Sequence, residues 1–137
     1  MKYLALDLRT KTLGLAISDK LGIIASPYKV LRYDEVNKLI EELLVIIEAE
    51  IVDELVLGLP KNMNNSLGFA SERSLNFKSL LEKKCTLPIH LVDERLSTME
   101  AENILISNDT SRQKRKKIID AYAASIILDT FLKSKKG

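Results

Sequence analysis

Short apolar runs separated by turn signals occupy the first quarter of the chain and predict three strands. The runs cover 3–8, 13–18 and 23–31, and the sequence DKLG at 19–22 separates the last two. Because the connections between the runs are short, the pattern predicts an antiparallel meander. The first run is apolar apart from Asp7, which is typical of a central strand that is covered on both faces.

Helical spacing of apolar side chains begins after the third run. The pattern predicts a helix within 33–50, for which Asp34 is a plausible N-cap. The remaining expected elements are strands at 54–60 and 88–94 and helices at 66–84, at 118–132 and from the capping box of Ser97 and Glu100. This order predicts an α/β fold with a mixed five-stranded sheet, its first three strands antiparallel, flanked by helices on both faces. We see no second-domain boundary and expect residues 1–137 to form one domain.

Composition narrows the class of protein without identifying it. A single cysteine, Cys85, excludes an intramolecular disulfide framework and fits a reducing compartment. No secretory signal pattern and no apolar stretch of membrane-spanning length is found, so we expect a cytoplasmic protein with no membrane partner.

Charge is distributed unevenly along the chain, although the net charge is only +2. Residues 112–137 carry a net charge of +6, and the preceding residues carry −4. The basic end is either a polyanion-binding surface or a solvated tail, and charge alone leaves both open. The polar stretch at 107–117 is the best candidate for a mobile loop.

Carboxylates stand at several positions where the pattern predicts burial. Asp7 lies in the first strand, Asp93 and Glu94 close the fifth, and Asp120 lies on the packed face of the last helix. Each has an ordinary structural explanation, such as a strand-end hydrogen bond, a loop start or a favourable place in the first turn of a helix. Together, acids at the edge of one sheet favour a Mg²⁺ site. Two such ions about 4 Å apart stabilise the attacking and leaving oxygens of a phosphodiester displacement.

Four motifs in order resemble the YqgF/RuvX family, described as pre-16S rRNA nucleases or Holliday-junction resolvase-like proteins. They read LALDLRTKTLGLAISD, GLPKNMNNSLG, VDERLST and KRKKIIDAYAASIIL. The resemblance implies an RNase H-like fold, with Asp7, Glu94 and Asp120 as catalytic acids that bind Mg²⁺ or Mn²⁺. Asp93 is the weaker candidate, because neighbouring strand residues point to opposite faces.

Two positions depart from the family pattern. The first motif usually reads D-x-G-T, and its glycine, which permits close approach of the backbone to a phosphate, is Arg9 here. Arg9 either binds a phosphate or packs outward. The family's NMDG turn is NMNN here, and Asn64 and Asn65 tolerate the backbone of such a turn.

Basic residues near the motifs are the expected nucleic-acid contacts. They are Arg9, Lys11, Arg95, Arg115, Lys116 and Lys117. Such contacts to phosphates are independent of sequence and sensitive to salt. The loop at 58–68 either binds a phosphate or is a structural connection.

Three functions compete at this point. The resemblance favours a metal-dependent endonuclease that processes the 5′ end of pre-16S rRNA or, alternatively, resolves branched DNA. The second function is an ATP-dependent phosphotransferase, against which the short chain argues, and the third is a non-catalytic ribosome assembly factor. A monomer or a weak homodimer is expected.

Overall fold

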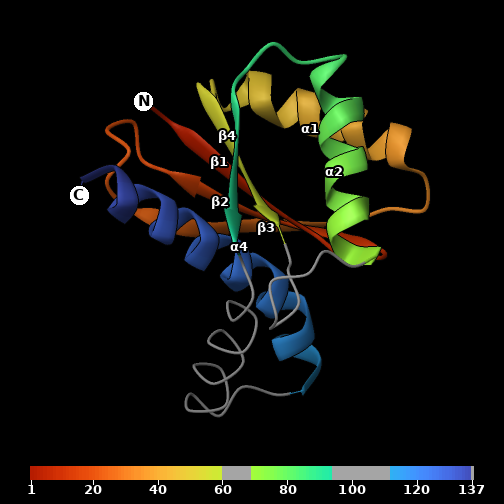
Figure 1. The fold of residues 1–137 in the computed structure, drawn as a ribbon. Helices are drawn as coiled ribbons and strands as arrows, with labels where there is room; N and C mark the ends of the chain where they lie inside the picture. Colours follow the sequence, from red (N-terminus) through yellow and green to blue (C-terminus); the bar gives the residue numbers. More distant parts are fainter. Residues whose placement is uncertain (60–68, 94–111, 137) are drawn as a thin grey trace.

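The computed structural model describes residues 1–59, 69–93 and 112–136, and in these ranges the order of elements agrees with the expectation. Labels follow Figure 1. The elements are β1 (Tyr3–Leu8), β2 (Thr12–Ser18), β3 (Ala25–Arg32), α1 (Val36–Ala49), β4 (Glu54–Leu59), α2 (Phe69–Glu82), β5 (Ile89–Asp93) and α4 (Arg112–Lys136). The helix expected from Ser97 and the loop at 60–68 lie outside the described residues.

The five strands form one mixed sheet in the order β3-β2-β1-β4-β5. The pairs β1–β2 and β2–β3 are antiparallel, whereas β4 pairs in parallel with both β1 and β5. Helices α1 and α2 lie on one face and α4 lies on the other (Figure 1). The predicted α/β class, the mixed five-stranded sheet and the antiparallel meander are therefore confirmed.

The central strand β1 contributes to two separate hydrophobic cores. Its even positions, Leu4, Leu6 and Leu8, pack with α1 and α2. Tyr3 and Ala5 pack with α4. Because side chains alternate along a strand, position 7 belongs to the face that α4 covers.

Helix α4 runs antiparallel to β1 across this face. The rings of Tyr3 and Phe131 meet edge to face with centroids 5.3 Å apart, and Lys135 donates a hydrogen bond to the Tyr3 hydroxyl. The two chain ends consequently lie on the same side of the molecule (Figure 1). The N-terminal half of α4 is directed toward the end of β1 that carries Asp7.

The limits of the last helix differ from the expectation. Helix α4 begins at Arg112 rather than 118 and continues to Lys136 rather than 132. The mobile loop predicted at 107–117 is therefore wrong for 112–117, which are helical. Polar composition suggested a loop, but Arg, Lys and Gln are good helix formers and the segment has no Gly or Pro.

Two further boundaries are corrected. The N-cap of α1 is Glu35 rather than Asp34, and no side chain hydrogen bonds there. Strand β3 begins at Ala25, because the Asp19 carboxylate accepts hydrogen bonds from the backbone N–H groups of Ile23 and Ile24 at 2.7 and 2.9 Å. These N–H groups hold the pKa of Asp19 below its usual value. None of the described helices has the length and apolar character needed to cross a membrane.

Helix α1 ends in a Schellman motif with an unusual residue at its left-handed position. The N–H of Val52 donates to the carbonyl of Ile47, and the N–H of Ile51 donates to the carbonyl of Glu48. Ile51 has a φ of 52° and is 77% exposed. A β-branched residue is strained in this conformation, which glycine adopts readily.

We predict that Ile51→Gly stabilises the protein by about 1 kcal/mol, because it removes this backbone strain. The melting temperature should rise by about 3–5 °C in a thermal scan. Ile51→Ala is the matched control, because it removes the exposed side chain but keeps a Cβ. Equal stabilisation by both variants would contradict a backbone cause.

Candidate functional site

The carboxylate of Asp7 is completely buried on the α4 side of β1. Arg9 donates two hydrogen bonds to its Oδ2 atom, from Nη2 at 3.0 Å and from Nε at 3.2 Å. An ionised carboxylate in such a place costs several kcal/mol of desolvation unless a cation compensates it. The ion pair with Arg9 provides that compensation inside the fold.

The backbone of Arg9 is held at the tight turn between β1 and β2. Its N–H donates to the carbonyl of Thr12 at 2.8 Å, and its own carbonyl accepts a hydrogen bond from the Tyr33 hydroxyl at 2.5 Å. Burial raises the pKa of Tyr33, so this hydroxyl is a protonated donor at neutral pH. The Arg9 side chain is 36% exposed. The guanidinium therefore lies between a buried acid and solvent.

Glycines flank Asp7 on both neighbouring strands. Gly14 of β2 lies directly opposite it, and the register of Leu6 with Leu57 makes Gly58 the next residue of β4 alongside. Both glycines are buried. These two positions thus add no side chain to the sheet beside the carboxylate, and glycine inside a strand is typical of a place that a ligand or another chain segment approaches closely. Both glycines lie inside the quoted motifs, but neither was predicted as a neighbour of Asp7, although a glycine inside an apolar strand pattern is a recognisable signal.

Position 120 belongs to α4, but the side chain of Asp120 is outside the description. Tyr3 of β1 contacts Phe131 of α4. Measured from this contact, Asp7 lies about 13 Å further along β1. Position 120 is about 16 Å back along the helix. It precedes the buried Ala124 by one turn of the same helical row. The register therefore brings the backbone of position 120 toward the end of β1.

Of the two acids at the end of β5, the structure describes Asp93. His90 stacks on Phe131 with ring centroids 4.8 Å apart, and Val92 packs against the same core, so both lie on the α4 face. Asp93 is the last residue of β5, is exposed and alternates to the opposite face. Glu94 lies outside the described residues.

The expected nucleic-acid contacts are only partly within the description. Arg9 and Lys11 lie at the β1–β2 turn, where Lys11 is exposed. Arg115, Lys116 and Lys117 lie in α4, whose first residues have no described side chains, and Arg95 falls outside the described residues.

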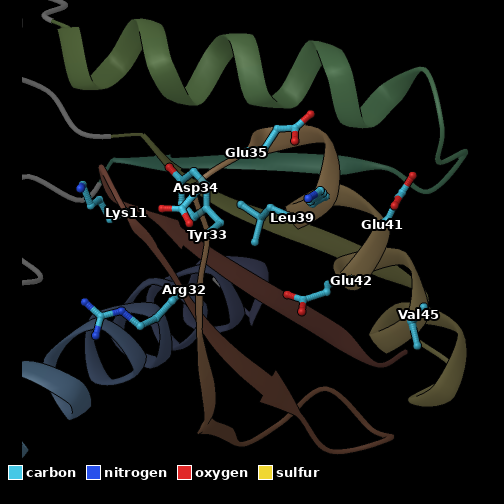
Figure 2. Close-up of a pocket in the computed structure, with 10 residues that line it drawn as sticks. Lys11, Arg32, Tyr33, Asp34, Glu35, Leu39, Glu41, Glu42 and Val45 are labelled. Atoms are coloured by element: carbon cyan, nitrogen blue, oxygen red, sulfur yellow. The ribbon is translucent and has the colours of Figure 1, made fainter.

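A surface groove lies next to this turn, between the end of β3 and α1 (Figure 2). Its charges are mixed: Asp34, Glu35, Glu41 and Glu42 face the groove together with Lys11, Arg32 and Lys38. Within 1–59, 69–93 and 112–136, no three or more His, Cys, Asp or Glu side chains form a group that could hold a metal ion. Among the described residues, the groove thus carries four acidic and three basic side chains and no such metal-binding group.

Solved structures define the class of fold. The chain aligns over its full length with T. thermophilus RuvC in complex with a Holliday junction substrate, covering 96% of that chain with a TM-score of 0.64 and 14% identity. It aligns equally with all of the fowlpox virus resolvase in complex with Holliday junction DNA, with a TM-score of 0.63 and 12% identity. The fold is thus that of the RuvC-like resolvases, which is RNase H-like.

Family membership follows from the sequence comparisons. Residues 1–134 match the model of the RuvX family, described as Holliday junction resolvase, and the chain belongs to this family. A relative from Geobacillus sp. (strain WCH70) is 48% identical over 99% of this chain and 100% of its own length. A relative from Staphylococcus saprophyticus is 50% identical over 97% of this chain and 96% of its own length. Both bear the name "Putative pre-16S rRNA nuclease". The resemblance stated from the four motifs is confirmed.

We predict that Tyr33→Phe destabilises the protein by about 1 kcal/mol, because the carbonyl of Arg9 loses a partly buried hydrogen bond. Urea denaturation measures the change. Tyr28→Phe is the matched control, since the Tyr28 hydroxyl bonds Glu50 at the exposed surface at 3.2 Å. Equal losses in the two variants would argue against a special role of the Tyr33 hydroxyl at the turn.

Proposed function

We propose that this protein is a metal-dependent endonuclease that acts on structured nucleic acid, with the 5′ end of pre-16S rRNA as its substrate. The observation that carries the proposal is the fully buried carboxylate of Asp7, at the end of the central strand and on the face that α4 covers. Relatives about half identical to this chain bear the name of such a nuclease.

The proposed catalytic acids are Asp7, Glu94 and Asp120. Support for Asp120 comes from the register of α4 against β1, which directs position 120 toward the end of β1. Glu94 is an even number of positions from His90 and Val92, the two β5 residues on the α4 face. Strand alternation would direct it to that same face. The three acids would then lie on the side of the sheet that α4 covers.

The residues around Asp7 fit a divalent cation in two respects. The buried carboxylate requires a compensating positive charge, which the Arg9 guanidinium supplies at 3.0 Å in this structure. Gly14 and Gly58 add no side chain to the sheet on either side of Asp7. Carboxylate oxygens are the hard ligands that Mg²⁺ and Mn²⁺ prefer. When bound, such an ion would stabilise the charge on the oxygens of a phosphodiester undergoing in-line attack by water.

Nucleic-acid binding is assigned to basic residues on either side of the acids. Arg9, Lys11 and Arg95 would contact phosphates from the strand ends. Lys116 and Lys117 precede Asp120 by about one turn of α4, so a rigid helix carries them rather than a loop. We propose that they guide the phosphate backbone toward the acids.

Branched DNA is the second candidate substrate, favoured by the description of the family as Holliday junction resolvase. A resolvase acts with two active sites and requires a homodimer, whereas an RNA-processing enzyme can act as a monomer. Family membership favours a nuclease over the phosphotransferase. We further propose that residues 1–137 work as one domain and that the protein acts in the cytoplasm, where pre-rRNA is found.

We predict that Asp7→Asn lowers Mn²⁺-dependent cleavage by at least about 10²-fold, because the variant lacks the charge that holds the metal. The assay compares labelled pre-16S rRNA carrying its 5′ extension with a four-way DNA junction, each with Mg²⁺ or Mn²⁺. Cleavage of the RNA alone supports rRNA processing, and cleavage of the junction alone supports resolution.

Asp93→Asn is the matched control for this experiment, since it removes a carboxylate from the opposite face of the sheet. This variant should retain activity. Salt-sensitive RNA binding without metal-dependent cleavage of any substrate would favour the non-catalytic assembly factor. Equal cleavage by the wild-type protein and Asp7→Asn would overturn the assignment of Asp7.

We predict that the double variant Lys116→Ala, Lys117→Ala weakens binding to all RNA sequences alike. The slope of log K against log salt is negative, and each lost phosphate contact reduces its magnitude by about 0.7 for single strands and 0.9 for a B-DNA duplex. Binding is measured by fluorescence anisotropy at several salt concentrations. The double variant Lys83→Ala, Lys84→Ala, at two exposed positions just after α2, is the control of equal charge. An equal change in slope for both pairs would contradict a specific role of α4.

A further inference from the structure

We propose that Arg9 is a displaceable counter-ion, which compensates Asp7 in the metal-free protein and moves to a substrate phosphate when a metal ion binds. The inference rests on the proposed function, because it takes Asp7 to be a metal ligand. It goes further by assigning a coupling between metal and nucleic acid to the residue that replaces the glycine of the family motif.

Competition for one carboxylate oxygen is the first step. Both N–H groups that Arg9 offers to Asp7 are directed at Oδ2. A metal ion bound through Oδ2 needs the same electron pairs, and its positive charge repels the guanidinium. The ion pair and a metal complex at this oxygen would therefore compete with each other.

Arg9 rather than Asp7 is the residue that can move. Asp7 is fully buried inside a strand that is paired on both sides. The Arg9 side chain is 36% exposed, whereas its backbone is held through Thr12 and Tyr33. The proposed exchange therefore requires movement of the Arg9 side chain away from the acid, with the turn unchanged.

The released guanidinium has an obvious acceptor when nucleic acid is present. A guanidinium binds phosphate oxygens with two parallel hydrogen bonds, as it binds a carboxylate. A phosphodiester that reaches the metal site arrives within the range of the Arg9 side chain. Metal binding thus makes available a phosphate-binding group that is otherwise engaged with Asp7, and the two ligands strengthen each other.

Metal binding to the full-length chain tests the first step. Mn²⁺ affinity is measured by calorimetry and by thermal unfolding for the wild-type protein, Arg9→Gly, Arg9→Lys, Asp7→Asn and Arg32→Ala. Arg9→Gly should bind Mn²⁺ about tenfold more tightly, because a charge-assisted pair no longer competes. Its metal-free form should melt at a lower temperature, because Asp7 loses its cation. Mn²⁺ should therefore raise the melting temperature of Arg9→Gly more than that of the wild-type protein.

Two further variants complete this comparison. Arg9→Lys keeps the positive charge but loses the paired N–H donors of the guanidinium. Its Mn²⁺ affinity should lie between those of the wild-type protein and Arg9→Gly. It also provides the test if Arg9→Gly does not fold. Arg32→Ala, on the neighbouring strand, removes an exposed arginine that forms no ion pair with the described residues, and should match the wild-type protein.

The second step is tested by RNA binding with EDTA or with Ca²⁺, which replaces the catalytic metal to limit cleavage. Arg9→Gly should bind RNA as the wild-type protein does in EDTA, and about tenfold more weakly in Ca²⁺. Equal weakening under both conditions would show that Arg9 is a permanent phosphate ligand and would overturn the exchange.

The outcomes separate the inference from the proposed function. If Asp7→Asn binds Mn²⁺ as well as the wild-type protein, Asp7 is not a metal ligand and the proposed function fails at this residue. If Asp7→Asn loses Mn²⁺ binding while the affinities of Arg9→Gly and Arg9→Lys equal that of the wild-type protein, the proposed function stands. The displaceable counter-ion is then wrong.

Discussion

The charge of Asp7 has to be compensated within the protein, because its carboxylate is completely shielded from water. Desolvation at such a place costs several kcal/mol, and an apolar residue would pack there without that cost. The surroundings are built around the acid: Arg9 supplies the cation, and Tyr33 and Thr12 hold the turn from which Arg9 reaches it. This arrangement is easier to understand as part of a site than as a device for stability.

The alternation of side chains along β1 determines which helix the Asp7 carboxylate faces. Leu4, Leu6 and Leu8 anchor one face of the strand to α1 and α2, so the odd positions are directed to α4. A shift of register by one residue would move Asp7 into the larger core. The contact of Tyr3 with Phe131 then sets how far along the strand α4 lies. Hydrophobic packing at one end of β1 thus determines which part of the helix approaches the acid at the other end.

The spacing of apolar residues and the turn signals were sufficient to predict most of the helices and strands, because both are local properties of the sequence. Asp7 was identifiable for the same reason, as one charge within an apolar run. Propensity overrode polarity at Arg115 to Lys117, which are helical although their composition suggested a loop. Strand order was not predictable, because pairing of β1 with β4 depends on contacts between residues distant in sequence.

The candidate site also contains residues that the sequence identifies and residues that only the fold brings to it. Gly14 and Gly58 acquire their meaning only when the register sets them beside Asp7. The hydrogen bond from Tyr33 to Arg9 joins residues 24 apart and leaves no trace in a local pattern. Sequence could name the acids individually. The neighbours that create space and charge around Asp7 follow from the sheet.

Arg9 fills with a charged side chain the space that the family glycine would leave open, and it does so without straining the backbone. Among the described residues, only Ile51 combines a side chain with a positive φ, so the backbone at Arg9 does not demand glycine. What glycine would offer there is room for a phosphate to approach the backbone. Arg9 occupies that room with a group that itself binds phosphate, while its turn remains closed by Thr12. Under the proposed exchange, substrate approach survives the substitution because the guanidinium leaves the acid when a metal ion binds.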